Sequence, residues 1–280
     1  MNASPDRYAV IGHPVDHSKS PEIHAAFAHQ TGQNLIYERL PAAPGAFKTT
    51  AAAFFADGGA GLNVTLPFKG DAAAYANRLT DRARRAGAVN TLARGDDGTL
   101  LGDNTDGIGL VRDLEHRLDI PIAGRRILIL GAGGAVRGVI PVLLEYGAEA
   151  VCIANRTLSK AETIARDFAD LGNIQTCALT TSANGWDIVI NAISAGLAGE
   201  MPNLSPAILE NTHGAYDMVY ADQPTPFLRW VADHGIERRC DGFGMLVEQA
   251  AESFMVWRGI RPQTAEVIAA LRPGSDRQRS

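Results

Sequence analysis

The sequence predicts an α/β fold built from two domains. Short apolar segments alternate with segments of helical character along most of the chain, and this alternation is typical of βαβ units with a parallel sheet. From residue 126 onward the apolar segments become nearly continuous, as expected for parallel strands that are buried on both faces. With 280 residues, the chain is long for one hydrophobic core and short for three domains.

The first half of the chain is expected to contain short elements. Strands are expected at residues 8–11, 34–40 and 61–66, with a hairpin of residues 88–94 and 99–101 around Asp96-Asp97-Gly98. Helices are expected at residues 20–30, 44–57, 72–79 and 81–86. The first of these helices has Ser20 as its predicted N-cap and Pro21 at its first helical position. A helix at residues 104–118 is the expected connection between the domains.

The second half is expected to form a doubly wound parallel sheet. Buried strands are expected at residues 126–130, 150–154, 187–192 and 215–219. A glycine-rich turn and a helix follow the first of them, so that strands and helices alternate as in βαβ units. Two further helices are expected at residues 244–257 and 264–271.

Composition and charge exclude several classes of protein. Hydrophobic residues make up 46% of the chain and charged residues 20%, as in ordinary globular proteins. The formal net charge is -5, so neither nucleic acid nor an anionic membrane surface is expected as a partner. The sequence has no apolar run that could span a bilayer and no apolar segment typical of a signal peptide before residue 8, so a cytoplasmic location is expected.

The spacing of ligand and nucleophile residues argues against metal and hydrolase chemistry. The three cysteines, Cys152, Cys177 and Cys240, are far apart, and we expect them to be small buried hydrophobic residues rather than a disulfide or metal framework. No His, Asp or Glu cluster has the spacing of a metal site. No serine lies in a nucleophile elbow, so neither a metalloenzyme nor a hydrolase is expected.

A glycine-rich turn follows the strand expected at residues 126–130. Its residues are Gly131, Ala132, Gly133, Gly134 and Ala135. The first glycine permits a tight turn, and the second lets the backbone approach a pyrophosphate at the N-terminus of the next helix. The third position of this fingerprint is normally Gly or Ala but is Val136 here. The context still predicts a Rossmann-type dinucleotide site, although an ordinary strand–helix turn is the alternative.

The end of the next strand indicates which dinucleotide is bound. An NAD site places a carboxylate there, which would repel a 2′-phosphate. The chain instead has Asn155-Arg156-Thr157, with Lys160 one turn further on. A guanidinium and a hydroxyl are suited to bind a phosphate, so we predict NADP; a solvated strand end with incidental charge is the alternative.

Several polar residues lie at strand ends and helix starts in the first half of the chain. Taken singly, each has an ordinary structural explanation: an N-cap for Ser20, a surface lysine for Lys69, and a carboxylate that complements a helix dipole for Asp106. Taken together, they predict a site for a polyol or an acid that faces a nicotinamide. The residues are Ser18, Ser20, Asn63, Thr65, Lys69, Asn90 and Asp106.

Several further segments of the chain carry a resemblance to a known family over about residues 8–272. The segments that carry the resemblance in the first half are Ser18-Lys19-Ser20-Pro21, Asn63-Val64-Thr65-Leu66-Pro67-Phe68-Lys69, Gly87-Ala88-Val89-Asn90-Thr91 and Gly102-Asp103-Asn104-Thr105-Asp106-Gly107. In the second half they are the glycine-rich turn, Asn155-Arg156-Thr157, Asp217-Met218-Val219-Tyr220 with Thr225-Pro226, and residues 242–249. Through these segments the chain resembles the shikimate dehydrogenase family.

The resemblance implies a role for each matching residue. Lys69 and Asp106 would form the acid–base pair at the reacting hydroxyl, with Lys69 donating a proton to the carbonyl oxygen of 3-dehydroshikimate as hydride arrives. The substrate-binding residues would be Ser18, Ser20, Asn63, Thr65, Asn90, Tyr220 and Gln249. The NADP-binding residues would be Gly131, Ala132, Gly133, Gly134, Ala135, Asn155, Arg156, Thr157, Lys160, Met218 and Gly242, the last two beside the nicotinamide.

The resemblance also implies a domain organisation and a place in metabolism. Residues 1–106 would form an α/β substrate-binding domain with a mostly parallel sheet, residues 107–238 a Rossmann NADP-binding domain, and residues 239–280 helices that return to the substrate domain. The reaction would serve chorismate and aromatic amino-acid biosynthesis. The expected partner is a small-molecule substrate, and the expected assembly is a monomer or a homodimer.

Alternative functions differ from this prediction at particular residues. A quinate or aminoshikimate dehydrogenase would use the same scaffold, but Thr65 and the absence of an acidic residue after Asn155-Arg156 argue against the quinate version that uses NAD. A catalytically silent NADP(H) sensor would lack Lys69 or Asp106. A folate-type dehydrogenase of similar architecture is not supported by the serine pair.

One residue departs from the pattern of the shikimate dehydrogenase family. Ile193 stands where that family usually has threonine, so any contact of that hydroxyl with the cofactor would be lost.

Overall fold

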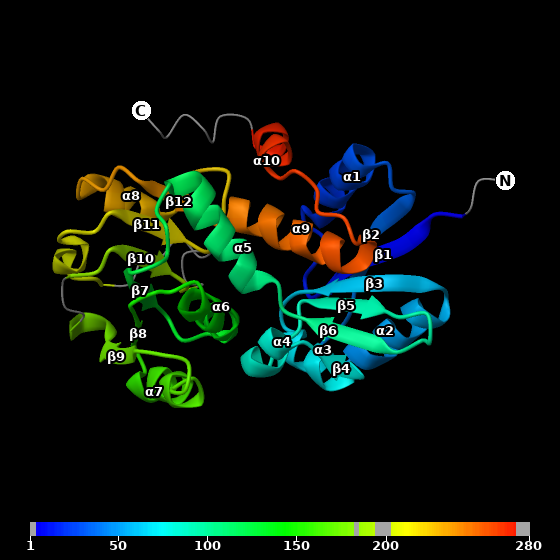
Figure 1. Cartoon of the computed structure of the whole chain (residues 1–280), viewed down its shortest axis with the longest axis horizontal. Helices are drawn as coiled ribbons and strands as arrows, with labels where there is room; N and C mark the ends of the chain where they lie inside the picture. The colour runs from blue at the N-terminus through cyan, green and yellow to red at the C-terminus, as the bar shows by residue number, and fades with distance from the viewer. Residues whose placement is uncertain (1–3, 182–184, 194–202, 273–280) are drawn as a thin grey trace. The chain divides into compact units, whose positions relative to one another are not determined.

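The computed structural model describes residues 4–181, 185–193 and 203–272. The chain divides into two compact units, each with its own sheet. Unit 1 comprises Met1–Asp106 and Val247–Arg272, and the main part of unit 2 is Gly107–Leu246. The mixed α/β architecture with two parallel-rich sheets agrees with the predicted fold class (Figure 1). Which unit binds which ligand stays a prediction at this point.

Unit 1 contains a six-stranded sheet in the order β2-β1-β3-β5-β6-β4. Its strands are β1 (Asp6–Gly12), β2 (Leu35–Pro41), β3 (Gly59–Val64), β4 (Arg78–Leu79), β5 (Thr91–Arg94) and β6 (Leu100–Asp103). Strand β1 pairs in parallel with β2 and β3, and β4 pairs in parallel with β6. Strand β5 is antiparallel to both of its neighbours, so the predicted hairpin is confirmed and the sheet is mostly parallel.

Helices cover both faces of this sheet. They are α1 (Ser20–Thr31), α2 (Phe47–Ala56), α3 (Lys69–Tyr75), α4 (Asp81–Ala86), the part of α9 (Phe243–Arg258) from Val247 onward, and α10 (Ala265–Leu271). Successive side chains of a strand point to opposite faces. Ala9 and Ile11 of β1 accordingly pack against α2, α3 and α4, whereas the ring of Tyr8 lies 4.6 Å from that of Trp257 in α9.

Two local predictions in unit 1 are wrong. The helix expected at residues 72–79 ends at Tyr75, because the backbone becomes extended at Ala76 and residues 78–79 pair with β6. The N-cap of α1 is Lys19, and Ser20 is the first residue of the helix. The Ser20 hydroxyl lies 3.1 Å from that of Ser18 instead of capping a backbone N–H group.

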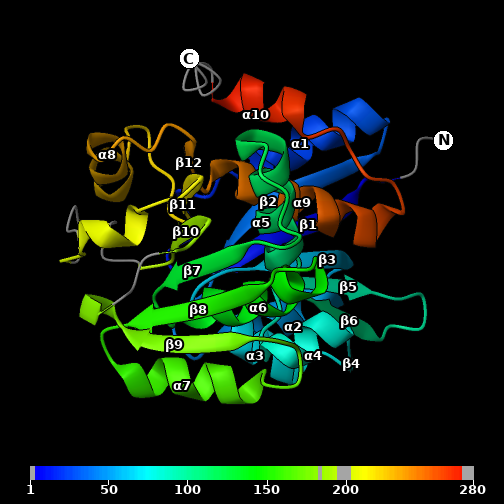
Figure 2. The ribbon, with the colours of Figure 1, turned by 60° about the vertical axis from the view of Figure 1, so that its left-hand side comes forward.

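Unit 2 contains a six-stranded, fully parallel sheet in the order β12-β11-β10-β7-β8-β9. Its strands are β7 (Arg126–Leu130), β8 (Ala150–Asn155), β9 (Ile174–Ala178), β10 (Ile188–Asn191), β11 (Gly214–Asp217) and β12 (Arg239–Asp241). Counted within the unit, this order is 3-2-1-4-5-6 in reverse, the arrangement of a Rossmann sheet. Strands β7, β8 and β9 lie side by side in Figure 2, with α7 (Leu158–Asp167) along β9.

The core of unit 2 also follows the alternation of its strands. Ile127 and Ile129 of β7 lie in a cluster with α5 (Asp106–Asp113), the π-helix Leu114–Leu118, α6 (Gly134–Glu145) and α7. Leu128 and Leu130 lie in a second cluster with α8 (Pro226–Asp233) and the 3-10 turn Pro206–Leu209. Another 3-10 turn covers Leu179–Thr181. The helix expected at residues 104–118 therefore changes to π geometry after Asp113.

Two features of the described residues bear on the class of protein. None of the described helices is long and apolar enough to cross a membrane. In the same part of the chain, no three His, Cys, Asp or Glu side chains are grouped so that they could hold a metal ion.

Candidate active site

Polar residues of unit 1 gather at one edge of its sheet. Ser18 and Ser20 follow β1, Thr65 and Lys69 follow β3, and Asp106 follows β6. These three strands run in the same direction, because β5 is antiparallel to both β3 and β6. The carboxyl ends of parallel strands are where open α/β sheets commonly bind ligands. We call this group the polar cluster of unit 1; its members are Ser18, Ser20, Asn63, Thr65, Lys69, Asn90, Asp106 and Gln249.

Lys69 and Asp106 are in direct contact. The Lys69 Nζ atom donates to Asp106 Oδ2 over 2.5 Å. Lys69 begins α3 and Asp106 begins α5, so the chain places both side chains at the first turn of a helix. The Lys69 side chain is 23% exposed and that of Asp106 is 9% exposed. A cation that is partly open to solvent and held by a buried carboxylate can exchange a proton with a bound ligand.

The amide of Asn90 connects this pair to the rest of the cluster. Its Nδ2 atom lies 2.9 Å from Asp106 Oδ1 and 3.2 Å from Gln249 Oε1. Its Oδ1 atom accepts a hydrogen bond from the backbone N–H of Thr105 over 2.9 Å. Asn90 is buried, so these contacts replace its bonds to water and fix the orientation of the amide.

Asn63 is held by the protein at both ends of its amide. Its Nδ2 atom donates to Ser253 Oγ over 2.9 Å, and its Oδ1 atom accepts from the Tyr37 hydroxyl over 2.7 Å. Burial raises the pKa of the Tyr37 phenol well above its usual value, so the phenol remains protonated and able to donate. Sequence reasoning assigned no role to Tyr37 or Ser253.

The two serines and Thr65 lie on loops at the same edge. The backbone N–H of Ser20 donates to Ser18 Oγ over 3.3 Å. The Arg39 guanidinium donates to the Ser18 carbonyl oxygen over 2.6 Å, which fixes this loop beside a positive charge. Thr65 packs tightly against Gly12, since a Cβ atom at Gly12 would lie only 2.4 Å from Thr65 Cγ2.

His24 stacks on Tyr37, whose hydroxyl donates to Asn63 of the polar cluster. The ring centroids lie 4.2 Å apart and the rings are nearly parallel. His24 is fully buried, and burial lowers the pKa of its imidazole to about 3. The imidazole is therefore neutral near pH 7 and acts as an apolar support for Tyr37 rather than as a charge in the site.

Other residues of this network were missed at the sequence level. Thr105 precedes Asp106, and its hydroxyl donates to the Gln249 carbonyl oxygen over 3.0 Å. Ser253 lies four residues after Gln249 on α9, and this helical spacing could have identified it. Tyr37 gave no such signal, because it reaches Asn63 of β3 only through the pairing of β1 with both β2 and β3.

In unit 2, the glycine-rich turn has the geometry that its sequence predicts. Gly131 has φ of 110°, a conformation that side chains rarely adopt. A Cβ atom there would also lie 3.2 Å from the Ala192 backbone. Gly133 and Gly134 are exposed, and a Cβ built on either one would have no described residue within 4 Å apart from its chain neighbours and the backbone of its own helix. The described residues thus leave space beside the first turn of α6, where a pyrophosphate would lie.

The unusual Val136 lies within the hydrophobic core. It is fully buried in the cluster that contains β7 and α6. Its backbone N–H donates to the Gly133 carbonyl oxygen over 3.1 Å. The valine thus packs between helix and sheet, and the turn keeps its form without a third small residue.

The predicted phosphate-binding residues lie between β8 and α7. The Asn155 amide donates to the Thr157 carbonyl oxygen over 2.8 Å. Thr157 is the N-cap of α7, but its side chain makes no capping hydrogen bond. Arg156 and Lys160 are exposed, so this segment presents two cations and a hydroxyl to solvent.

Met218 and Gly242, both predicted beside the nicotinamide, contact each other. A Cβ atom at Gly242 would lie 2.3 Å from the Met218 carbonyl oxygen, so only glycine allows this approach. The preceding Asp217 is buried and accepts hydrogen bonds from the backbone N–H of Val219 and the hydroxyl of Thr225. Tyr220 follows on the same loop and is 37% exposed.

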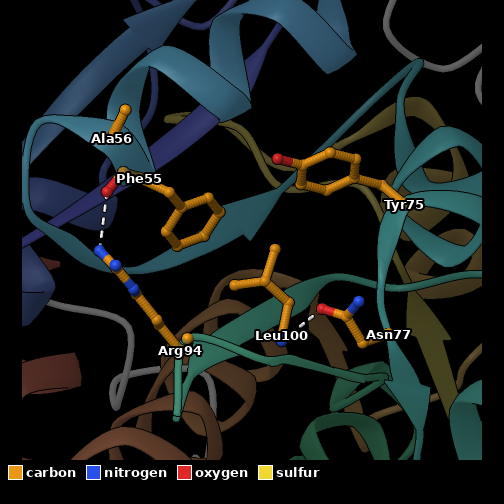
Figure 3. Close-up of a pocket in the computed structure, with 7 residues that line it drawn as sticks. Phe55, Ala56, Tyr75, Asn77, Arg94 and Leu100 are labelled. Atoms are coloured by element: carbon orange, nitrogen blue, oxygen red, sulfur yellow. Dashed lines mark hydrogen bonds between the residues drawn. The ribbon is translucent and has the colours of Figure 1, made fainter. Parts of the chain in front are cut away.

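Figure 3 shows a different cavity of unit 1, of about 310 Å³. Arg94 donates to the Phe55 carbonyl oxygen over 2.7 Å, and Asn77 Oδ1 accepts from the backbone N–H of Leu100 over 2.7 Å. Tyr75, Ala56 and Gly98 complete the lining. No predicted site residue lines this cavity, so it is separate from the polar cluster of unit 1.

Three family models match separate segments of the chain. The model of the shikimate dehydrogenase substrate binding domain matches residues 10–92. The shikimate/quinate 5-dehydrogenase model matches residues 114–199, and the model of the shikimate 5′-dehydrogenase C-terminal domain matches residues 242–272.

Individual relatives match over nearly the whole chain. The NADP(+) shikimate dehydrogenase of Alkalilimnicola ehrlichii is 55% identical over 96% of this chain and 99% of its own length. That of Thioalkalivibrio sulfidiphilus is 56% identical over 96% and 98%, respectively. The crystal structure of shikimate 5-dehydrogenase from Thermus thermophilus in complex with NADP(H) and shikimate is 34% identical, with a TM-score of 0.86 over 95% of this chain and 98% of that chain. This chain therefore belongs to the shikimate dehydrogenase family.

Proposed function

We propose that this chain is an NADP-dependent shikimate dehydrogenase that reduces 3-dehydroshikimate reversibly to shikimate. The observation that carries the proposal is the contact of 2.5 Å between Lys69 and Asp106, at the strand edge where open α/β sheets commonly bind ligands. Full-length relatives with this activity support the choice of substrate and cofactor.

The residues of unit 2 fit NADP. The turn that begins at Gly131 offers backbone N–H groups and open space to a pyrophosphate. Arg156, Thr157 and Lys160 would hold the adenosine phosphate, with Asn155 positioning this segment. Ala132, Gly133, Gly134 and Ala135 would complete the pyrophosphate site, and Met218 with Gly242 would line the nicotinamide.

Hydroxyl and amide groups would hold the substrate. Ser18, Ser20 and Tyr220 would bind the carboxylate, for which neutral hydroxyl donors are suited. Thr65, Asn63, Asn90 and Gln249 would bind the ring hydroxyls and the carboxylate end. Asn63, Asn90 and Gln249 are already fixed by hydrogen bonds to the protein, so these side chains lose little conformational entropy when the ligand binds.

Lys69 and Asp106 would move and hold the proton. When bound, the reduced nicotinamide supplies the hydride that reaches the carbonyl carbon. The Lys69 ammonium donates a proton to the carbonyl oxygen and takes it back in the reverse direction. Asp106 orients the ammonium, because Asn90 occupies its Oδ1 atom and leaves Oδ2 to Lys69. The ammonium also stabilises the negative charge that develops on the oxygen.

The alternatives differ in substrate and cofactor. A quinate dehydrogenase on the same scaffold would accept a ring with one more hydroxyl, and an NAD enzyme would not need Arg156. The NADP(H) sensor would bind the cofactor without turnover.

We assign the shikimate activity to chorismate and aromatic amino-acid biosynthesis. Restored growth without aromatic amino acids, in a bacterium whose own shikimate dehydrogenase is deleted, would test this assignment.

The decisive experiment follows nicotinamide absorbance with purified protein. Shikimate and quinate are each offered with NADP and with NAD, in all four pairings. Fast reduction only with shikimate and NADP is the expected result. Comparable rates with quinate or NAD would place the chain among dehydrogenases of broader specificity. NADP binding without turnover in any pairing would contradict the proposed activity and favour the sensor.

A further inference from the structure

A partly buried group of charges lies beside the polar cluster of unit 1 and has no part in the mechanism above. Arg82 of α4 donates to both carboxylate oxygens of Asp103, at the end of β6, over 2.7 and 2.5 Å. Both Nη atoms of Arg82 also lie 3.3 Å from Oε1 of Glu252 in α9. We propose that Arg82 and Asp103 are positioning residues that hold Asp106 and Gln249 in place for the reaction. The proposal rests on the function proposed above.

The connection from Asp103 to Asp106 runs through a short turn. Asp103 Oδ1 accepts from the backbone N–H of Asn104 over 2.7 Å. The Asn104 side chain in turn accepts from the backbone N–H of Asp106 over 3.2 Å and donates to the Ala88 carbonyl oxygen over 3.0 Å. The backbone of Asp106 is therefore fixed relative to the segment that contains Asn90.

The connection from Arg82 to Gln249 runs along α9. Glu252 lies three residues after Gln249, so both belong to neighbouring positions on one helix. Gln249 contacts Asn90 and Thr105. A single guanidinium thus joins the loop that ends in Asp106 to the helix that contains Gln249, and Asn90 contacts both of these residues.

The geometry and the burial show that this is a strong ion pair. The Asp103 side chain is 2% exposed and that of Arg82 is 22% exposed. Burial alone would raise the pKa of Asp103, but hydrogen bonds and the charge of Arg82 lower it below its usual range. Parallel bonds from a guanidinium fork to a carboxylate also define an angle, which a lysine at the same position would not.

The first test is the Asp103→Asn variant. An asparagine keeps the size of the side chain but turns an N–H₂ group or a neutral oxygen toward Arg82. Because a displacement of about 1 Å can cost about 100-fold in rate, we expect kcat with shikimate and NADP to fall about 10- to 100-fold. The KM for shikimate is expected to rise much less, by about threefold or less, because Gln249 is linked to this ion pair whereas the carboxylate-binding Ser18 and Ser20 are not.

A double-mutant cycle separates positioning from general destabilisation. In an Asp106→Asn background, Asp103→Asn is expected to lower kcat less than about twofold further, because the residue on which it acts is already disabled. The same loss in both backgrounds, or an unchanged kcat in Asp103→Asn alone, would overturn the proposal. Arg82→Lys and Glu252→Gln are milder variants that test the same link if Asp103→Asn folds poorly.

A matched control and a ligand-free measurement complete the design. Asp6→Asn removes another ion pair of α9, between Asp6 and Arg258, and is expected to leave kcat unchanged. Hydrogen exchange at the amides of Asn104 and Asp106, measured without ligands, is expected to quicken in Asp103→Asn and not in Asp6→Asn; equal exchange in both would contradict the link. Failure of the wild type to oxidise shikimate would instead contradict the proposed function and leave this exchange result standing.

Discussion

The candidate residues of unit 1 bond mainly to one another, whereas those of unit 2 mainly face solvent. Asn90 and Asn63 are buried and have protein partners at both ends of their amides. Gly133 and Arg156 are exposed, and the hydrogen bonds described at their turns join residues that are close in the sequence. Unit 1 thus fixes side chains before a ligand arrives, while unit 2 offers backbone and charge. Proton transfer demands exact placement, but phosphate binding tolerates mobile cations.

Among the variants that compare the two units, Asp106→Asn is expected to have the largest effect. An asparagine cannot hold the Lys69 ammonium by charge, so the orientation of the proton donor is lost. We expect kcat to fall about 100-fold and the free energy of unfolding to fall by about 1–3 kcal/mol, because the N–H₂ group of the asparagine must face either Asn90 Nδ2 or Lys69 Nζ, which are both donors. Steady-state kinetics and urea unfolding measure the two quantities. Asp71→Asn changes an exposed carboxylate of α3 and should alter neither; a similar rate loss there would contradict the specific role of Asp106.

The next effect concerns the cations of unit 2. Arg156→Gln removes a charge that the 2′-phosphate of NADP would meet, at a cost of about 1.5–3 kcal/mol for a charge-assisted hydrogen bond. The KM for NADP should rise about 10- to 100-fold, while the weak use of NAD should stay the same. Arg166→Gln, at an exposed position of α7, is the control. If both cofactors were affected equally, Arg156 would not discriminate between them.

Two asparagines compare the units by stability alone. Asn63→Ala leaves the buried hydroxyls of Tyr37 and Ser253 with one partner fewer, and we expect a loss of about 1–3 kcal/mol in the free energy of unfolding. Asn155→Ala removes one bond at a half-buried strand end, with an expected loss of about 0.5 kcal/mol. Denaturant unfolding gives both values. Equal losses would show that the two sites do not differ in rigidity as described.

The smallest effect is a difference in pH dependence between two buried carboxylates. The pKa of Asp103 is lowered, so its contribution to stability is present above the unfolded pKa of about 3.9 and is lost as pH falls through the folded value. Burial raises the pKa of Asp217, so protonation as pH falls favours its folded state. The loss of unfolding free energy that Asp103→Asn causes should therefore become smaller as the pH falls, and the loss that Asp217→Asn causes should become larger. Unfolding curves measured across this pH range would show whether the signs are opposite.

The two units also differ in how much of their structure can be predicted from the sequence. The strand at 126–130, the turn after it and the cations near residue 156 are consecutive in the chain, so local pattern is enough to place them. Strands β9 and β12 escaped prediction because the first is half-buried at a sheet edge and the second is only Arg-Cys-Asp. Helix α8 was missed as well, although Thr225 caps it and Pro226 begins it.

In unit 1, the sequence predicts the members of the cluster but not how they are held. Lys69 and Asp106 are 37 residues apart, and only the order of the strands brings them together. Asp103 lies inside a segment that the resemblance highlighted, yet its partner Arg82 looked like one of several arginines on a short helix. Contacts of this kind depend on tertiary packing, which a single sequence does not display.

The most direct test of the account is the Lys69→Ala variant, with shikimate binding and turnover measured separately. Calorimetry in the presence of NADP reports binding, and nicotinamide absorbance reports turnover; Lys48→Ala, at an exposed position of α2, is the control. The account predicts that kcat falls about 100- to 10,000-fold while the Kd for shikimate changes only a few-fold. Near-normal turnover with much weaker binding would show that Lys69 only holds the substrate, and would contradict its role in proton transfer.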